Sequence, residues 1–371
     1  MPSPAQQRFV IDDGTQVGEA RRAAQSLANF EFTAEIAGKV AIVATELANN
    51  LLRHAGGGEL LIQMMGTAEE SALELLAVDK GPGMQDVALC MRDGYSTGGT
   101  PGTGLGAVRR LASEFDIFSH AGEGTVVLAR FGRSDLHRHG AINVALEGEI
   151  ESGDAWYIER GSGGTALMIV DGLGHGTFAA EAARVGIEAF AASPFSSPQE
   201  TMVRANALMS RTRGGAGACA LVHEGRVSYA GIGNISGVLV SPGKSQGLVS
   251  HNGTLGMGNR RAQQFEYACE PGALLVMHSD GVSARWNVRD RADLLACHPA
   301  VIAGVIYRDH GRGRDDATVV EFGVQRDHAL VGFLELLTQG GDVRFTRGEL
   351  RGQIDDHVGT TTTVASSRPR P

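Results

Sequence analysis

The sequence predicts an α/β chain of the α+β kind, in which an α/β sandwich is followed by an α/β-β/α sandwich built on antiparallel sheets. Three observations predict this class. The 371 residues fit about two domains of ordinary size. Helical and strand periods alternate over roughly the first 131 residues. After them come many short, Gly-punctuated strand candidates with two long helices among them.

In the first part, residues 8–131, helical periodicity alternates with short apolar runs. We expect its helices to cover one face of a single sheet, which a hairpin around Ala121-Gly122-Glu123-Gly124 closes. The expected helices are 17–30, 34–54 and 105–113, and the expected strands are 8–11, 60–65, 72–78, 115–120 and 125–131.

The polar residues 132–140 predict a linker to the second part, residues 141–323. The pattern weakens in the C-terminal extension 324–371, and we expect disorder from about residue 359. The expected helices of the second part are 177–192, 198–212 and a further one around 289–306. Its expected strands are 141–150, 155–159, 165–170, 218–223, 226–230, 236–240, 264–268, 273–278 and 317–322.

Composition excludes several classes of protein. A net charge of −9 with scattered Lys and Arg argues against a nucleic-acid partner. No 18-residue apolar run or apolar leader is present, so we expect no membrane association. The four cysteines are widely spaced and form no CxxC, which fits a reducing, cytoplasmic location.

A carboxylate and an amide share one face of the predicted helix 34–54. Glu46 and Asn50 lie side by side at the edge of the expected buried stripe, and Asn49 points to the opposite side. A carboxylate can accept a proton from a hydroxyl nucleophile, and an amide oxygen can bind Mg²⁺ that bridges ATP phosphates. On periodicity alone, two ordinary polar rim residues remain the alternative. The expected stripe is Val40, Val43, Ala44, Leu47 and Leu51.

Two glycine-rich segments follow. Asp79 ends an apolar strand and could accept the adenine amino proton, while Gly81 and Gly83 would let the backbone approach the base; a plain turn is the alternative. A second group of glycines opens the helix 105–113, where free backbone N–H groups can hold phosphates. A flexible loop explains this run equally well. The glycines of the second group are Gly102, Gly104 and Gly106.

Four acidic spots follow or precede apolar strands in the second part. Carboxylates that gather at strand ends can hold two hard cations, which activate water and clamp phosphoryl oxygens. Each Asp-Gly alone is a common turn, but four such spots together favour a metal centre. We interpret His175 as a turn or substrate-rim residue. The acidic spots are Asp154, Asp171-Gly172, Asp280-Gly281 and Asp315-Asp316.

The segments of residues 8–131 together resemble the GHKL ATPase fold, and more narrowly the RsbT-type serine kinases of bacterial stress switches. ELANNLLRHAGGG, DKGPGM and STGGTPGTGLGAVRRLASEFDIFS resemble that family's N-box, adenine box and phosphate loop. The resemblance implies that Glu46 is the catalytic base and that Asn50 holds Mg²⁺. It also implies ATP binding by Asp79, Gly81, Gly83, Gly102, Gly104, Gly106 and Thr125.

The second part resembles the SpoIIE-type branch of the PPM metal-dependent Ser/Thr phosphatases, nearest to its RsbX-like members. The matching segments are ESGDAWY, MIVDGLGHG, GIGNISGVLV, LLVMHSDGV and GRDDATVV. The resemblance implies two Mn²⁺ or Mg²⁺ ions. Asp171, Asp280 and Asp315 would hold one, Asp171 and the Gly172 carbonyl the other, with Asp154 acting directly or through water. Asp316 would support the site, and Arg160 is a candidate for the basic residue that contacts the substrate phosphate.

These resemblances imply a bifunctional regulator that phosphorylates and dephosphorylates Ser or Thr of a protein partner. Its substrate in trans would be a STAS-domain antagonist in a stress or sigma-factor partner-switching pathway, and a sigma factor or other switch regulator is a further possible partner. One alternative is an ATP-binding module that sequesters a sigma factor or activator and controls the phosphatase without kinase activity. Another is a phosphatase whose ATP domain is only a sensor.

Overall fold

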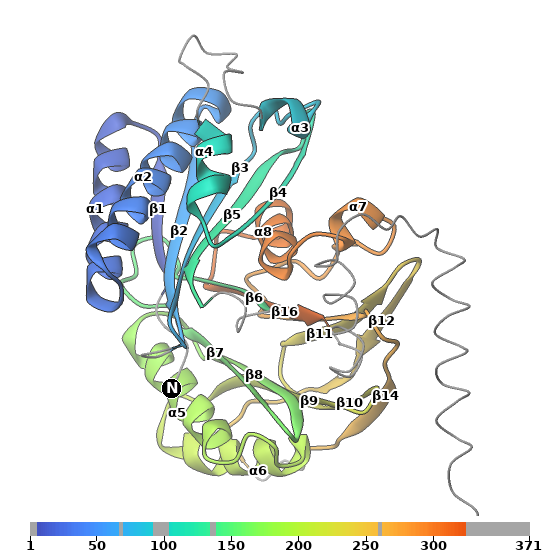
Figure 1. Ribbon diagram of the computed structural model, residues 1–371. Helices are drawn as coiled ribbons and strands as arrows, with labels where there is room; N and C mark the ends of the chain where they lie inside the picture. The colour runs from blue at the N-terminus through green and yellow to red at the C-terminus, as the bar shows by residue number, and fades with distance from the viewer. Residues whose placement is uncertain (1–5, 67–69, 92–103, 134–138, 259–261, 324–371) are drawn as a thin grey trace, which may run out of the picture. The chain divides into compact units, whose positions relative to one another are not determined.

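The computed structural model describes residues 6–66, 70–91, 104–133, 139–258 and 262–323. Residues 1–324 form one compact unit. Its first five strands make an antiparallel sheet in the order β1-β2-β3-β5-β4 (Figure 1). The elements are β1 (Gln7–Ile11), α1 (Gly14–Glu31), α2 (Ala34–Asn50), η1 (Leu51–Ala55), β2 (Gly58–Met65), β3 (Ala72–Asp79), α3 (Val87–Cys90), α4 (Gly104–Leu111), β4 (Glu114–His120) and β5 (Gly124–Gly132).

Helices α1, α2 and α4 pack on one face of this sheet, as the sequence predicts. Asp13 caps α1 through the N–H groups of Thr15 and Gln16, and Gln16 bonds back to the N–H of Asp13 in a capping box. All five residues of the predicted stripe on α2 are buried. After Asn50 the predicted helix continues as the π-helical turn η1 and stops at Gly56 in the left-handed conformation.

The second part holds two antiparallel sheets (Figure 1). One has the order β12-β11-β15-β16-β6, and the other β13-β10-β9-β8-β7 with β14 also paired to β10. Among the described strands, only the short β13 is parallel to its neighbour. The elements are β6 (His139–Val144), β7 (Asp154–Gly161), β8 (Gly164–Gly172), α5 (Thr177–Ala191), α6 (Pro198–Leu208), η4 (Met209–Arg211), β9 (Gly215–His223), β10 (Arg226–Ile232), β11 (Ser236–Ser241), β12 (Lys244–Leu248), β13 (Ser250–His251), β14 (Phe265–Ala268), β15 (Leu274–His278), α7 (Ala292–Leu295), α8 (Pro299–His310) and β16 (Ala317–Gly323).

The inner faces of these two sheets form one core, and α5 and α6 cover the outer face of the sheet that contains β8. The other outer face, on β6, β15 and β16, is covered by α8. This is the α/β-β/α sandwich that the sequence predicts.

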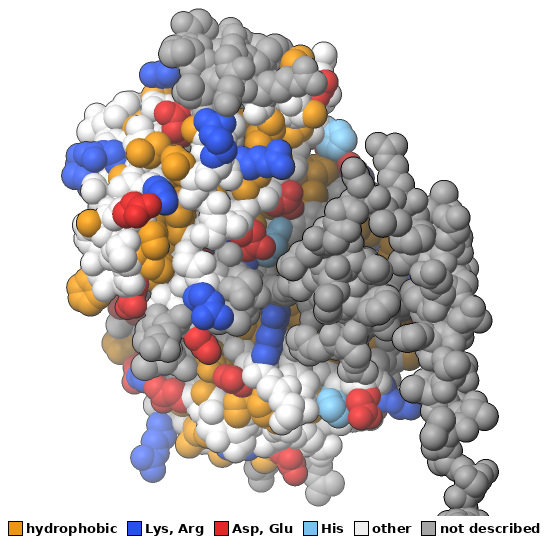
Figure 2. Space-filling view, viewed as in Figure 1, with side chains coloured by type: hydrophobic (Ala, Val, Ile, Leu, Met, Phe, Trp, Pro, Cys, Tyr) orange, Lys and Arg blue, Asp and Glu red, His pale blue; other side chains and the backbone are white. Residues whose placement is uncertain are grey.

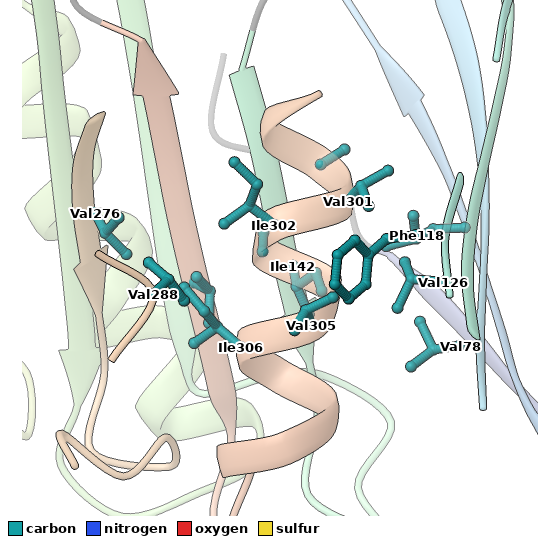
Figure 3. Packing of buried hydrophobic residues seen from close by; sticks show 14 of the residues in the cluster. Val78, Phe118, Val126, Ile142, Val276, Val288, Val301, Ile302, Val305 and Ile306 are labelled. Atoms are coloured by element: carbon teal, nitrogen blue, oxygen red, sulfur yellow. The ribbon is translucent and has the colours of Figure 1, made fainter. Parts of the chain in front are cut away.

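Helix α8 also contacts β3 and β5 of the first part, so it lies between two sheets (Figure 3). Val301 and Val305 face Phe118 and Val126 of the first sheet, while Ile302 lies on the side of the second part. A Cβ added at Gly304 would lie 2.7 Å from Val126 Cγ1, so the glycine permits this close approach. The two parts therefore share a hydrophobic core.

Several elements differ from the sequence-based expectation. The strand predicted at 141–150 ends at Val144. The helix predicted around 289–306 is interrupted at 296–298, because Pro299 at the first helical position and the His298 cap start a new helix. The α-helix predicted at 198–212 ends at Leu208 and continues as the single 3₁₀ turn η4. Three short elements, α3, β12 and β13, are not predicted from the sequence.

No helix in the described ranges is both long and apolar enough to cross a membrane. On the face shown in Figure 2, Lys and Arg side chains lie in small groups separated by acidic, apolar and other side chains.

A buried polar network fastens the first sheet to β6 and α8. Arg130 and Glu74 are fully buried, and their side chains form an ion pair of 2.6 Å. Arg130 also donates to the carbonyl of His139 at 2.7 Å, and its Nη1 lies 3.1 Å from His298 Nε2. Gln63 donates to Glu74 at 2.6 Å. Each of these buried groups therefore has a hydrogen-bond partner in place of the water that it loses on folding.

Arg130→Met is expected to lower the free energy of unfolding by about 3–5 kcal/mol, because Glu74 would remain buried without its cation. Urea unfolding measures the loss. The double variant Arg130→Met/Glu74→Leu should recover part of it, since no unpaired charge then remains. Arg109→Met, on the exposed side of α4, should change stability by no more than about 0.5 kcal/mol. A similar loss from both single variants would contradict the role of the buried pair.

Glu321 on β16 is a second buried carboxyl group, and neither of its oxygens has a hydrogen-bond partner within the described chain. Burial raises the pKa of Glu321 well above its ordinary value of 4.5. The folded protein therefore keeps a proton that the unfolded chain releases above that value. Stability must then fall as pH rises, by up to about 1.4 kcal/mol per pH unit while only the folded state holds the proton.

Glu321→Gln should abolish this dependence, so the variant should gain stability relative to the parent as pH rises from 5 toward 7. Urea unfolding of both proteins across this range measures the difference. Parallel stability curves for the two proteins would show that Glu321 does not titrate differently in the folded and unfolded states.

Candidate functional sites

The first candidate site is built around the end of α2. Glu46 and Asn50 stand one helical turn apart, and both are partly exposed. A Cβ added at Gly104, the first residue of α4, would lie 3.5 Å from Glu46 Oε2 and 3.6 Å from Asn50 Oδ1. The structure therefore brings the start of the glycine-rich helix to the carboxylate–amide pair. Gly106 is buried in α4, and Gly102 lies outside the described residues.

Asp79 ends β3 opposite Thr125 at the start of β5. Its Oδ1 accepts the N–H of Gly81 at 2.8 Å and the N–H of Thr125 at 3.1 Å, whereas Oδ2 has no hydrogen bond within the described chain. Burial raises the pKa of Asp79, and these two donors oppose the rise. The Thr125 hydroxyl lies 2.9 Å from that of Ser119. This arrangement leaves one carboxylate oxygen to accept a hydrogen bond from a ligand.

The glycines beside Asp79 are required by packing as well. Gly83 has φ +65°, and a Cβ there would lie 1.9 Å from the carbonyl oxygen of His120. At Gly81, a Cβ would lie 2.6 Å from the Cα of Ala55. The segment after Asp79 is thus pressed between the π-helical turn and the β4–β5 hairpin, and a side chain at either position would displace it.

The second candidate site lies where β7 begins and β8 ends. Asp154 and Asp171 are paired across these antiparallel strands, so their carboxylates lie side by side. Burial, followed by the charges of Asp280, Asp315 and Asp316, raises the pKa of Asp171 to about 7. Burial and the charge of Asp171 raise the pKa of Asp154. The topology therefore brings all the predicted acidic residues within electrostatic reach of Asp171.

Two neighbouring side chains organise these carboxylates. Asp316 is buried and accepts the N–H groups of Leu146 and Gly153, each at 2.8 Å, which fits the supporting role that the resemblance implies. Asn234 donates from Nδ2 to Asp280 Oδ2. Asn234 lies in the segment GIGNISGVLV, but no role is predicted for it from the sequence.

The glycine that follows each of two acidic residues has a packing role. A Cβ at Gly172 would lie 2.1 Å from the carbonyl oxygen of Ala179, and one at Gly281 would lie 2.0 Å from that of Asp316. At each of these Asp-Gly pairs, the glycine allows close packing against the backbone of another segment. This packing holds the neighbouring carboxylate in position.

Among the described residues, no three His, Cys, Asp or Glu side chains are arranged closely enough to form a complete metal site. The residues nevertheless fit hard cations. Asp154 Oδ2 is buried without a hydrogen-bond partner in the described chain, which is costly for a carboxylate. Burial, and after it the charges of the neighbouring carboxylates, raises the pKa of Asp171, so its ionised form is disfavoured without a cation. Divalent cations with oxygen ligands would relieve both penalties.

Two family profiles match the two parts of the chain. Residues 11–131 match the Histidine kinase-like ATPase domain, and residues 161–325 match Stage II sporulation protein E (SpoIIE). The Serine/threonine-protein kinase RsbT of Bacillus subtilis (strain 168) is 40% identical over 91 residues, which are 24% of this chain and 68% of that kinase. The chain belongs to the RsbT family. In this chain an RsbT-type half, residues 11–131, is followed by a SpoIIE-type half, residues 161–325.

Solved structures similar to parts of this RsbT-family chain include one of the bacterial stressosome, with 27% identity, a TM-score of 0.46 and coverage of 49% of this chain and 97% of the other. RsbX in complex with magnesium has 17% identity and a TM-score of 0.43. The similarity covers 56% of this chain and 98% of the RsbX chain. The Mycobacterium tuberculosis serine/threonine phosphatase PstP/Ppp has 15% identity and a TM-score of 0.42. The similarity covers 51% of this chain and 98% of the PstP/Ppp chain.

One expectation for the SpoIIE-type half is wrong. Arg160 pairs with Thr165 at the far end of β7, six residues from Asp154. Six residues of strand span about 20 Å, so Arg160 cannot contact a phosphoryl group beside Asp154. His175 lies in the loop after Gly172, is exposed, and pairs with Glu149 at 2.6 Å.

Proposed function

We propose that this protein phosphorylates a Ser or Thr of a protein partner with ATP through its RsbT-type half and removes phosphate from phosphoserine or phosphothreonine through its SpoIIE-type half. The observation that carries the proposal is that one compact unit assembles both sites. Gly104 lies against Glu46 and Asn50 in one, and Asp154 pairs with Asp171 in the other.

In the RsbT-type half, Glu46 would accept the proton of the attacking hydroxyl group, because it stands at the open side of α2 beside the phosphate-loop helix. Asn50 would hold the Mg²⁺ of Mg·ATP. The free Oδ2 of Asp79 would accept the adenine amino group, with Thr125 supporting this pocket from the neighbouring strand. Gly81, Gly83, Gly102, Gly104 and Gly106 would complete the ATP site.

In the SpoIIE-type half, Asp171, Asp280 and Asp315 would hold one Mn²⁺ or Mg²⁺. Asp171 and the Gly172 carbonyl would hold the second, with Asp154 acting directly or through water. When bound, the two ions would activate a water molecule and stabilise charge on the phosphoryl oxygens. Asn234 and Asp316 would keep the ligand-bearing segments in place.

The partner we propose is a separate STAS-domain antagonist in a cytoplasmic stress or sigma-factor switch. The RsbT relative is a serine/threonine-protein kinase, which supports a hydroxyl acceptor on a protein. A sigma factor or another switch regulator is a second proposed partner.

A time course with γ-labelled ATP, Mn²⁺ and a purified STAS-domain protein tests both activities. We expect label to enter the STAS protein and then to leave it as inorganic phosphate. An Asp171→Ala variant should accumulate label, and a Glu46→Gln variant should transfer none. No transfer by the Asp171→Ala variant would contradict the kinase assignment.

The shared core favours a second candidate, in which the ATP-binding half sequesters a sigma factor or activator and controls the phosphatase without transferring phosphate. Helix α8 contacts the ATP-site strands β3 and β5 and the phosphatase strands β6 and β16. Under this candidate, ATP would change the rate of dephosphorylation while no protein acceptor gains label.

A further inference from the structure

Arg160 lies too far from the proposed phosphatase site to contact a substrate phosphate. Another arginine lies next to the metal-ligand loop. Arg213 stands between η4 and β9, and the next residue, Gly214, accepts the N–H of Leu173 at 2.9 Å. Leu173 directly follows the proposed ligand Gly172, so this hydrogen bond fixes the Arg213 segment beside the site.

The guanidinium group of Arg213 is held on two sides. A Cβ added at Gly174 would lie 3.3 Å from Arg213 Nη1, so the group rests against the backbone of the loop that begins with Asp171. On its other side, Arg213 Cζ lies 4.9 Å from the centre of the Phe178 ring, within the range of a cation–π contact. The Phe178 side chain is 62% exposed, so it contributes little to the core and serves as a platform for the arginine.

Apart from the ring of Phe178, the Arg213 side chain has no ion-pair or hydrogen-bond partner within the described chain. A guanidinium that stacks on a ring through its face keeps the N–H donors on its edge. This planar edge matches two oxygens of a phosphoryl group.

We propose that Arg213 binds the phosphoryl group of the phosphorylated protein substrate, and that Phe178 positions it. This role rests on the proposed phosphatase function. Glycine at position 174 suits the positive φ of +88° there, and a Cβ at this position would also lie 3.3 Å from Arg213 Nη1.

The test compares Arg213→Ala, Arg213→Lys and Phe178→Ala with the parent full-length protein. Arg211→Ala, an exposed basic residue of the same turn, is the matched control. The substrates are p-nitrophenyl phosphate and a phosphoserine peptide, assayed with Mn²⁺. Inorganic phosphate serves as a competitive inhibitor. Thermal unfolding with and without Mn²⁺ reports separately on the metal site.

Arg213→Ala should raise KM for both substrates and the inhibition constant of phosphate by about tenfold to a hundredfold, as expected for a lost charged hydrogen bond. The kcat value should change less, and Mn²⁺ should raise the Tm of the variant as it does that of the parent. Arg213→Lys should recover part of the affinity, and Phe178→Ala should weaken it a few-fold. Arg211→Ala should match the parent.

Unchanged KM and phosphate inhibition in Arg213→Ala would overturn the proposal, as would an equal effect of Arg211→Ala. An effect on the peptide alone would also overturn it, because Arg213 would then recognise the peptide and not its phosphate. If the parent protein turns over neither substrate, the phosphatase function itself fails, and this outcome is distinct from the first three.

Discussion

Replacing Asp171 with alanine is expected to abolish Mn²⁺- or Mg²⁺-dependent phosphatase activity, with a loss of well over about 100-fold. Mutation of residues that only support metal ligands costs 10–100-fold, so loss of a ligand shared by both ions should cost more. Asp171 is central to the site, because it pairs with Asp154 and lies within the electrostatic reach of Asp280, Asp315 and Asp316. Asp280→Ala should have the same effect. Turnover of p-nitrophenyl phosphate measures both.

Two further measurements make this expectation specific. Mn²⁺ should raise the Tm of the parent protein, since a ligand that binds only the folded state stabilises it, and should leave the Tm of Asp171→Ala unchanged. ATP binding should be the same in both proteins. Asp290→Ala removes an exposed carboxylate outside the site and should behave as the parent. Near-normal turnover by either Asp171→Ala or Asp280→Ala would refute the metal assignment.

The local elements of the fold were predictable because each has a strong signal in its own residues. The stripe from Val40 to Leu51 repeats at the period of a helix, and all its members are buried. The glycine-rich turn at 121–124 lies between two apolar runs and forms the β4–β5 hairpin. Such patterns depend only on neighbours in the chain.

The contact between the two parts was missed because its residues lie far apart in the sequence. A signal was nevertheless present. In α8 every residue from Ala300 to Ile306 is apolar, and a helix that is apolar all round must be covered on all sides. Strand β3 is likewise buried on both faces, with Leu75 in the helix-side core and Leu76 in the core around α8. These patterns predict that another layer covers α8 and β3, but they do not predict which part of the chain forms that layer.

The acidic residues of the second site could be found because each lies near the end of a strand, and Asp154, Asp171 and Asp280 also stand beside glycine. Asn234 and Arg213 could not, since neither has a local signal that separates it from any other polar loop residue. Arg160 was a reasonable expectation from its proximity to Asp154 in sequence. Because β7 is extended, however, Asp154 and Arg160 lie near its opposite ends, six residues apart.

Glu46→Gln is expected to keep ATP binding and to lose phosphoryl transfer to a protein hydroxyl by about 10²–10⁴-fold, the usual cost of removing a general base. The amide preserves the shape of the side chain beside Gly104 but cannot accept a proton. Asn50→Ala should instead weaken Mg·ATP binding, because it removes the oxygen ligand of the cation. Calorimetry with Mg·ATP and a label-transfer assay with a STAS-domain acceptor separate the two effects.

Asn49→Ala is the matched control for this pair, because it removes the same amide one position earlier on α2. The helix turns by 100° per residue, so the Asn49 side chain points about 100° away from that of Asn50, and Gly104 lies beside Glu46 and Asn50 but not beside Asn49. The variant should therefore bind Mg·ATP and transfer phosphate as the parent does. Equal damage from Asn49→Ala and Asn50→Ala would contradict the position of the site on this helix. If Glu46→Gln transferred phosphate at the parent rate, the carboxylate would not be the base, and an ATP-binding module that sequesters its partner would account better for this half.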